Sequence, residues 1–199
     1  MTSDPQNLEQ YCLAKSSLPS ELCNELENKT RATFSMANML IGKLEASFLA
    51  FLIHSLGVKR VLEIGTFTGY SALCMAEQLP ENGELITLDI NAHTAKLGME
   101  FWQRSPHGKK IRLIIGKAMD SLENLAGEFD LIFIDADKDN YPYYVQAALK
   151  RVSKQGVIIL DNALWSGKVL QTPAPDKQTA GIQNANDYIK QLSGVWSTL

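Results

Sequence analysis

Apolar residues follow two different periods along the chain, and the period changes near residue 57. Before that point they recur at helical spacing, as at Leu44, Phe48, Leu52 and Leu56. Ser20 precedes another such stripe and has the side chain of an N-cap. We therefore predict helices from residue 7 to about residue 56. The apolar stripe in this region that is formed by Phe34, Met36, Met39 and Leu40 is expected to lie in the core.

After residue 57 the chain changes to short apolar runs separated by segments long enough for helices. The runs are Val61–Ile64, Leu85–Leu88, Ile111–Ile115, Leu131–Ile134 and Val157–Leu160. Apolar strands joined by helical crossovers are typical of a parallel sheet with helices on both faces. The pattern predicts a doubly wound α/β fold, in which ligands bind beyond the carboxyl ends of the strands.

Length and charge limit the domain organisation and the class of partner. With 199 residues, of which 45% are hydrophobic, the chain is expected to form a single domain over residues 1–199. Residues 1–57 would form a helical lid or dimerisation layer, and residues 58–199 the α/β core. A net charge of -3 leaves no basic stripe for a phosphate backbone, so we expect a small-molecule partner and no nucleic acid.

Cysteine usage and hydropathy indicate the compartment. Cys12, Cys23 and Cys74 are odd in number and widely spaced, which predicts reduced thiols in a cytoplasmic protein. Residues 1–7 lack a basic stretch followed by an apolar segment, so no signal peptide is expected. We also expect no window to approach the roughly 20 apolar residues of a membrane span, and hence no membrane partner.

Oxygen-bearing side chains directly follow two of the predicted strands. Asp135 comes after the run that ends at residue 134, and Asp161 and Asn162 come after the run that ends at residue 160. Parallel strands would bring these three side chains together at one edge of the sheet. Neighbouring buried carboxylates repel each other unless a cation lies between them. A set of oxygen ligands suits Mg²⁺, Ca²⁺ or Mn²⁺ better than zinc.

Lys138 lies three residues after the first of these proposed ligands. A divalent ion nearby would lower the pKa of its ammonium group, as a general base working near neutral pH requires. The polar residues Asp139 and Asn140 are instead expected to cap a helix over residues 141–151.

The first predicted strand leads into a glycine-containing turn. Gly65 and Gly69 allow a tight turn and Ser71 follows, but the third glycine of a dinucleotide fingerprint is missing. Glu63 would place a negative charge where a pyrophosphate is repelled and a cationic ligand is tolerated. Asp89 closes the second strand and has the carboxylate that accepts both hydroxyls of a ribose, so the pattern indicates an adenosine ligand.

Together these residues resemble the cation-dependent class I O-methyltransferases that use S-adenosylmethionine, a family that includes the caffeoyl-CoA and catechol O-methyltransferases. The resemblance runs from about Met39 to the last residue. It is carried by the segments Glu63–Ser71, Asp135–Tyr141, Asp161–Gly167 and Thr179–Ile182 with Asn186. It implies a Rossmann-like fold, an S-adenosylmethionine-binding core over residues 58–199 and a homodimer.

The resemblance also implies roles for individual residues. Asp135, Asp161 and Asn162 match the metal ligands, and Lys138 matches the base that deprotonates the acceptor hydroxyl. Trp165 falls where family members line the acceptor pocket. Asp135 also belongs to the positions around the cofactor, of which the others are Met39, Glu63, Gly65, Ser71, Asp89 and Ala118.

Two segments depart from the family pattern. Ala46-Ser47 stands where the family often has Gly-Gln, so no contact is transferred to that turn. Residues 195–199 look like the start of a strand that the family continues into a final antiparallel pair, and we expect the edge strands at the C-terminal end of the sheet to be truncated.

The function expected from these features is divalent-metal-dependent methyl transfer from S-adenosylmethionine to a hydroxyl of a catechol-like diol. Two other classes stay open. A dehydrogenase that uses NAD would fit the same kind of sheet, although it leaves Asp135, Asp161 and Asn162 without a role. A module that binds the cofactor without turnover would keep the glycine turn and Asp89.

Overall fold

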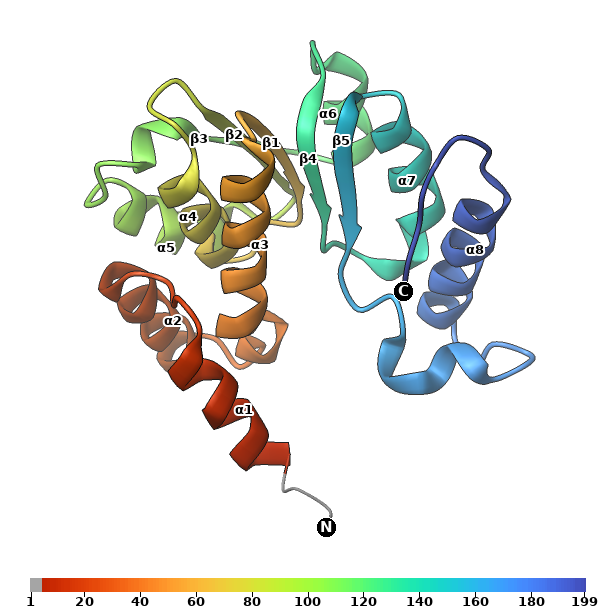
Figure 1. Cartoon of the computed structure of the whole chain (residues 1–199), viewed down its shortest axis with the longest axis horizontal. Helices are drawn as coiled ribbons and strands as arrows, with labels where there is room; N and C mark the ends of the chain where they lie inside the picture. Colours follow the sequence, from red (N-terminus) through yellow and green to blue (C-terminus); the bar gives the residue numbers. More distant parts are fainter. Residues whose placement is uncertain (1–4) are drawn as a thin grey trace.

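A five-stranded parallel sheet forms the centre of the protein, whose computed structural model describes residues 5–199 (Figure 1). Its strands are β1 (Arg60–Ile64), β2 (Glu84–Asp89), β3 (Ile111–Ile115), β4 (Phe129–Ile134) and β5 (Val152–Leu160). Their order is β3-β2-β1-β4-β5, and every neighbouring pair is parallel. The chain thus runs outward from β1 to β3 and then crosses back to β4, which confirms the predicted doubly wound α/β fold.

Helices cover both faces of this sheet. The α-helices are α1 (Pro5–Lys15), α2 (Glu21–Thr33), α3 (Lys43–Leu56), α4 (Tyr70–Gln78), α5 (Ala92–Trp102), α6 (Ala118–Asn124), α7 (Tyr141–Leu149) and α8 (Lys177–Gln191). Short 3-10 turns lie at η1 (Ala37–Met39), η2 (Gly108–Lys110), η3 (Lys138–Asn140) and η4 (Trp165–Leu170). The predicted N-cap is confirmed, since the Ser20 hydroxyl accepts a hydrogen bond from the backbone N–H of Cys23.

Alternate residues of each strand pack into separate cores on the two faces. On β1, Val61 packs with side chains of α2, α3, α4 and α5, whereas Leu62 packs with side chains of α6, α7 and α8. Figure 1 shows α3, α4 and α5 to one side of the strands and α7 and α8 to the other. Burial on both faces explains why the strands read as continuous apolar runs.

The predicted apolar stripe packs only in part against the core, contrary to expectation. Met36 and Met39 are 52% and 51% exposed, while Phe34 and Leu40 are partly buried against the core. The reason is that α2 ends at Thr33, after which the chain turns through η1 instead of continuing as an amphipathic helix. The two methionines, which belong to the N-terminal layer of residues 5–57, therefore lie on the surface.

Three element ends differ from the predictions. Helix α7 ends at Leu149, and Asn140 occupies its N-cap position without a side-chain cap, because its amide donates to the Asp137 carboxylate. Strand β5 begins five residues early, at Val152, through a register shift opposite β4. Residues 195–199 form no strand, and Trp196 is 98% exposed. The expected strand start is wrong there, because this segment makes no ladder with a neighbouring strand.

One segment reaches the length and composition of a membrane span, contrary to expectation. An 18-residue window within residues 37–56 has a mean hydropathy of 1.5. The continuous helix within them, α3, is only about 21 Å long at 1.5 Å per residue, against a bilayer core of roughly 30 Å. It also buries Ala46, Leu49 and Ile53 in the core beside α4. We therefore describe α3 as a packed helix of the N-terminal layer.

Candidate active site

The ends of β4 and β5 bring two carboxyl groups into contact. Ile134 and Leu160 are register partners, and the backbone N–H of Asp161 donates to the carbonyl of Ile134 at 3.0 Å. The side chains of Asp135 and Asp161 consequently lie within hydrogen-bonding reach of each other. Burial raises the pKa of Asp135 to about 6; Lys138 opposes this rise, and the charge of Asp161 adds to it.

Lys138 turns back onto this pair from η3. Its Nζ donates to Asp135 Oδ1 at 2.8 Å and to the hydroxyl of Tyr141 at 2.5 Å. The lysine side chain is only 8% exposed. Helix α8 approaches this turn closely at Gly181, where an added Cβ would lie 2.2 Å from the Lys138 carbonyl oxygen. Packing therefore fixes the position of the ammonium group next to the carboxyl pair.

Asn162 extends the carboxyl pair toward solvent. Its backbone has φ 57°, a left-handed conformation that asparagine tolerates, and its Nδ2 donates to Asp161 Oδ1 at 2.8 Å. Asn186 of α8 holds the following residue by donating to the carbonyl of Ala163 at 3.0 Å. The amide of Asn162 thus lies beside the carboxylates and is exposed, which leaves its oxygen accessible to a ligand.

Glu45 is a third acidic group beside this pair, and sequence analysis missed it. It lies in the first turn of α3, close enough to Asp161 for each carboxyl group to affect the pKa of the other. Burial raises the pKa of Glu45, and burial followed by the charge of Glu45 raises the pKa of Asp161. Glu45 directly precedes Ala46-Ser47, the dipeptide that departs from the family pattern, and only the packing of α3 on the sheet reveals this proximity.

Glu45, Asp135 and Asp161 form an acidic cluster. Its donor chemistry fits a hard divalent cation. Acidic groups that raise one another's pKa values hold surplus negative charge, and a cation that binds there offsets it. Within residues 5–199, no three His, Cys, Asp or Glu side chains form a group suited to a metal ion. The predicted set, however, combines the carboxylates of Asp135 and Asp161 with the amide oxygen of Asn162. Lys138 at Asp135 Oδ1 supplies part of the balancing charge.

The turn after β1 lies directly against the end of β4. Gly65 has φ 105°, and a Cβ there would lie 2.0 Å from the backbone oxygen of Asp135, so only glycine fits. Glu63 is fully buried, and its carboxyl accepts hydrogen bonds from the hydroxyls of Ser71 and Thr87, each at 2.5 Å. Burial raises its pKa to about 8. The expected negative charge facing a ligand is therefore absent near neutral pH.

Asp89 fixes the same turn from the end of β2. Its Oδ2 accepts the backbone N–H groups of Thr66 and Phe67 at 2.9 and 2.7 Å, and its Oδ1 accepts that of Asn91 at 2.8 Å. The carboxylate is partly exposed. Both lone pairs of Oδ2 are thus used, whereas Oδ1, which accepts one bond, keeps a second lone pair for a ligand hydroxyl. Asp89 thus shapes the glycine turn in addition to the ribose contact expected of it.

The remaining predicted residues belong to three other segments of the chain. Ala118 begins α6 beyond β3, and Met39 ends η1 on the surface. Trp165 packs against the core at α8, and its buried Nε1 has no hydrogen-bond partner. Trp165 also has a left-handed backbone, with φ 46°.

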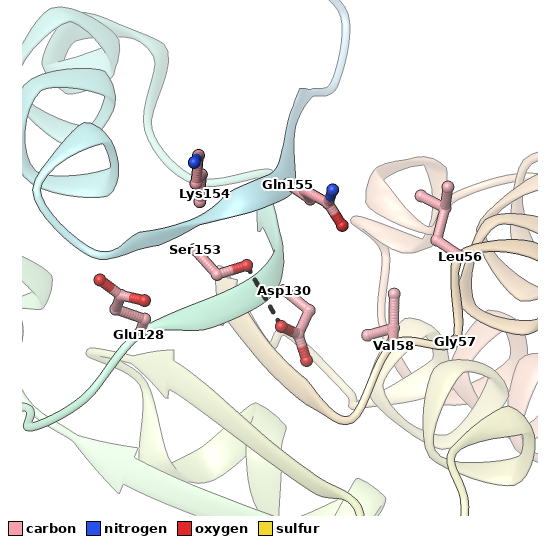
Figure 2. Close-up of a pocket in the computed structure, with 8 residues that line it drawn as sticks. All are labelled: Leu56, Gly57, Val58, Glu128, Asp130, Ser153, Lys154 and Gln155. Atoms are coloured by element: carbon pink, nitrogen blue, oxygen red, sulfur yellow. Dashed lines mark hydrogen bonds between the residues drawn. The ribbon is translucent and has the colours of Figure 1, made fainter.

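A pocket of about 380 Å³ lies at the opposite end of the strands, near the starts of β1, β4 and β5 (Figure 2). Asp130, which lines it, accepts hydrogen bonds from the backbone N–H groups of Lys59 and Arg60 and from the hydroxyl of Ser153. These bonds tie the strand starts together. We therefore interpret Asp130 as a structural residue, separate from the acidic cluster.

Comparison with known proteins agrees with this geometry. The family model described as O-methyltransferase matches residues 14–197. The chain belongs to the O-methyltransferase family. The predicted family resemblance and the predicted enzyme class are thereby confirmed.

Individual O-methyltransferases resemble the chain in sequence and in fold. Tapetum-specific methyltransferase 1 of Arabidopsis thaliana is 36% identical over 171 residues, which cover 82% of this chain and 73% of the relative. Caffeoyl-CoA O-methyltransferase 2 of Zea mays is 39% identical over 156 residues, which cover 75% of this chain and 58% of the relative. The O-methyltransferase TomG from Streptomyces achromogenes, solved in complex with SAM, has a TM-score of 0.90 at 25% identity. The match covers 97% of this chain and 89% of TomG.

Proposed function

We propose that this protein transfers the methyl group of S-adenosylmethionine to one hydroxyl of a catechol-like small molecule, with a divalent cation at the acidic cluster. The observation that carries the proposal is the contact of Asp135 with Asp161 at the ends of adjacent strands, with Lys138 Nζ 2.8 Å from Asp135 Oδ1. These groups lie beside the glycine turn. An edge where adjacent parallel strands end is where doubly wound sheets bind their ligands.

Support for the methyl donor comes from the turn after β1 and from the relatives. TomG, which shares the fold, was solved with SAM. Asp89 Oδ1 offers a carboxylate lone pair at the place where a ribose binds in related sheets. Gly65 lets the backbone of the turn approach the end of β4 closely. The residues proposed to surround the cofactor are Met39, Glu63, Gly65, Ser71, Asp89, Ala118 and Asp135.

Asp135, Asp161 and Asn162 are the residues proposed to hold the cation. When bound there, Mg²⁺, Ca²⁺ or Mn²⁺ would supply the positive charge that lowers the pKa of a neighbouring hydroxyl and that holds two vicinal oxygens. A single phenol offers only one such oxygen, which is why a catechol-like acceptor is proposed. The name of the maize relative, caffeoyl-CoA O-methyltransferase, supports this class.

Lys138 is the proposed general base. Methyl transfer is an in-line displacement, so the acceptor oxygen must lose its proton while it is held about 3 Å from the methyl carbon. In its neutral form, Lys138 takes that proton on the Nζ lone pair as the O–H bond breaks and an N–H bond forms. Burial of the lysine side chain limits competition from water. Trp165 and the loop after it are proposed to line the acceptor pocket.

The decisive experiment measures methyl incorporation from S-adenosylmethionine into a panel of catechols, with Mg²⁺ or with EDTA. We expect turnover with Mg²⁺ and its loss in EDTA. Asp135→Ala and Asp161→Ala should abolish metal-stimulated turnover, whereas Asp187→Asn, which removes an exposed carboxylate on α8, should retain it. Lys138→Ala should lower kcat by roughly 10²-fold or more. Full activity of the two alanine variants in EDTA would refute the metal role.

The methyl-incorporation assay and calorimetry together separate the two other functions that the sequence left open. Binding of S-adenosylmethionine without methyl incorporation into any catechol would indicate a cofactor-binding module. Calorimetric binding of NAD in place of S-adenosylmethionine would indicate a dehydrogenase. Membership of the O-methyltransferase family favours methyl transfer over both alternatives.

The N-terminal layer is also proposed to pair two copies of the chain into a homodimer. Its exposed side chains Leu8, Tyr11, Phe48 and Phe51 are 56%, 63%, 54% and 61% accessible, which supports burial against a second copy. Light scattering should give twice the chain mass, and Phe51→Glu should give the single mass; a monomeric parent protein contradicts the pairing.

The free thiols of the three cysteines support a reducing, cytoplasmic setting.

A further inference from the structure

Tyr141 begins α7 beside the acidic cluster and has no role in the mechanism proposed above. Its side chain is fully buried, with 0% exposure. Its hydroxyl is nevertheless surrounded by polar atoms from three places in the chain. Lys138 Nζ lies 2.5 Å away, and the backbone oxygens of Asp161 and Ile134 lie 2.9 and 3.1 Å away.

The hydrogen-bonding capacity of a phenol defines what this hydroxyl does. Its one proton is shared between the carbonyl oxygens of Ile134 and Asp161, at the ends of β4 and β5, and a lone pair of its oxygen accepts from Lys138 Nζ. The hydroxyl therefore joins the lysine to the backbone of both strands that carry the acidic pair.

As a base, Lys138 must be the neutral amine, which has two N–H groups and one lone pair, and the structure gives each N–H group an acceptor. One donates to Asp135 and one to Tyr141. Without the hydroxyl, the amine would keep its hydrogen bond to Asp135 and its place over the Tyr141 ring, 4.7 Å from the ring centre, but it would lose its second directional hydrogen bond. Because proton transfer depends steeply on donor–acceptor geometry, an amine held at two points is better aligned than one held at a single point.

We propose that Tyr141 is a positioning residue that aligns the Lys138 amine with the ends of β4 and β5. It does not touch the reacting atoms and acts through the lysine. This inference rests on the proposed role of Lys138 as base. The proton still moves from the acceptor hydroxyl to Nζ, and the phenol sets where Nζ stands when this happens.

Tyr141→Phe tests the inference, because it removes the hydroxyl and leaves the ring in its packing. We expect kcat to fall about tenfold, which corresponds to the loss of one hydrogen bond, while KM for the catechol and the dissociation constant of S-adenosylmethionine stay within about twofold of the parent values. Tyr144→Phe is the matched control. It removes another largely buried hydroxyl of α7, one that bonds Asp137 at 2.6 Å and does not contact Lys138, and it should retain the parent kcat.

A double-mutant cycle with Lys138→Met separates positioning from a general structural role. If Tyr141 acts through the lysine, adding Tyr141→Phe to Lys138→Met should lower the residual rate no further. A further tenfold loss in that background, or an unchanged kcat in Tyr141→Phe, would overturn the inference. Unimpaired turnover of Lys138→Met alone would instead refute the base itself, so the two failures are distinguishable. Thermal unfolding of each variant checks that it is folded.

Discussion

Replacing Glu63 by glutamine should flatten the pH dependence of stability, because the structure places a carboxyl with an unusual proton affinity in the core. Glu63 is fully buried between the hydroxyls of Ser71 and Thr87, and burial raises its pKa from 4.5 to about 8. In the unfolded chain the pKa returns to its ordinary value. Between these two values the folded protein binds a proton that the unfolded chain has released, so stability falls as pH rises.

The size of the effect follows from the number of protons involved. Between about pH 6.5 and 7.5 the folded state retains most of one proton on Glu63, and a full proton corresponds to about 1.4 kcal/mol per pH unit. Glu63→Gln should therefore remove about 1 kcal/mol per pH unit from the slope of the unfolding free energy. Asp135, with a pKa of about 6, contributes mainly below this range.

The assay is urea unfolding without ligands at several pH values across this range, followed by tryptophan fluorescence. Trp102 is a suitable reporter, since it is 6% exposed and its Nε1 donates to the carbonyl of Gly69. The control variant Glu100→Gln removes an exposed carboxylate on α5 and should leave the slope unchanged. Histidine contributions are common to all three proteins and cancel in the differences. Equal slopes for the parent and Glu63→Gln would refute the buried, protonated carboxyl.

Three further substitutions test how the site is positioned. Gly65→Ala should prevent stable folding or lower Tm sharply, because its Cβ would lie 2.0 Å from the Asp135 carbonyl oxygen; a parent-like Tm contradicts that contact. Gly181→Ala should reduce kcat by displacing Lys138, despite the better helix propensity of alanine, and an unchanged kcat argues against close packing of α8. Ser20→Ala should cost about 1 kcal/mol in urea unfolding through loss of the α2 cap, and no change would mean that the cap is dispensable.

Periodicity and residue chemistry were sufficient to predict the architecture and part of the site. The strands are apolar because both faces of the sheet are covered, and that pattern is visible in any one strand without its neighbours. The position of Asp135 and Asp161 directly after two strands was enough to predict their proximity, because parallel strands end at the same edge. The left-handed turn at Asn162 and the end of α7 at Leu149 depend on local packing and were not predicted.

The sequence by itself determined the order of strands and helices along the chain, the family, and the edge of the sheet at which polar groups gather. Each of these depends on neighbours along the chain. The tertiary structure alone decided that Glu45 reaches Asp161, that Glu63 is enclosed and protonated near neutral pH, and that Tyr141 joins Lys138 to two strands. These contacts depend on the distances between packed elements and on exclusion of water, which no local pattern of residues records.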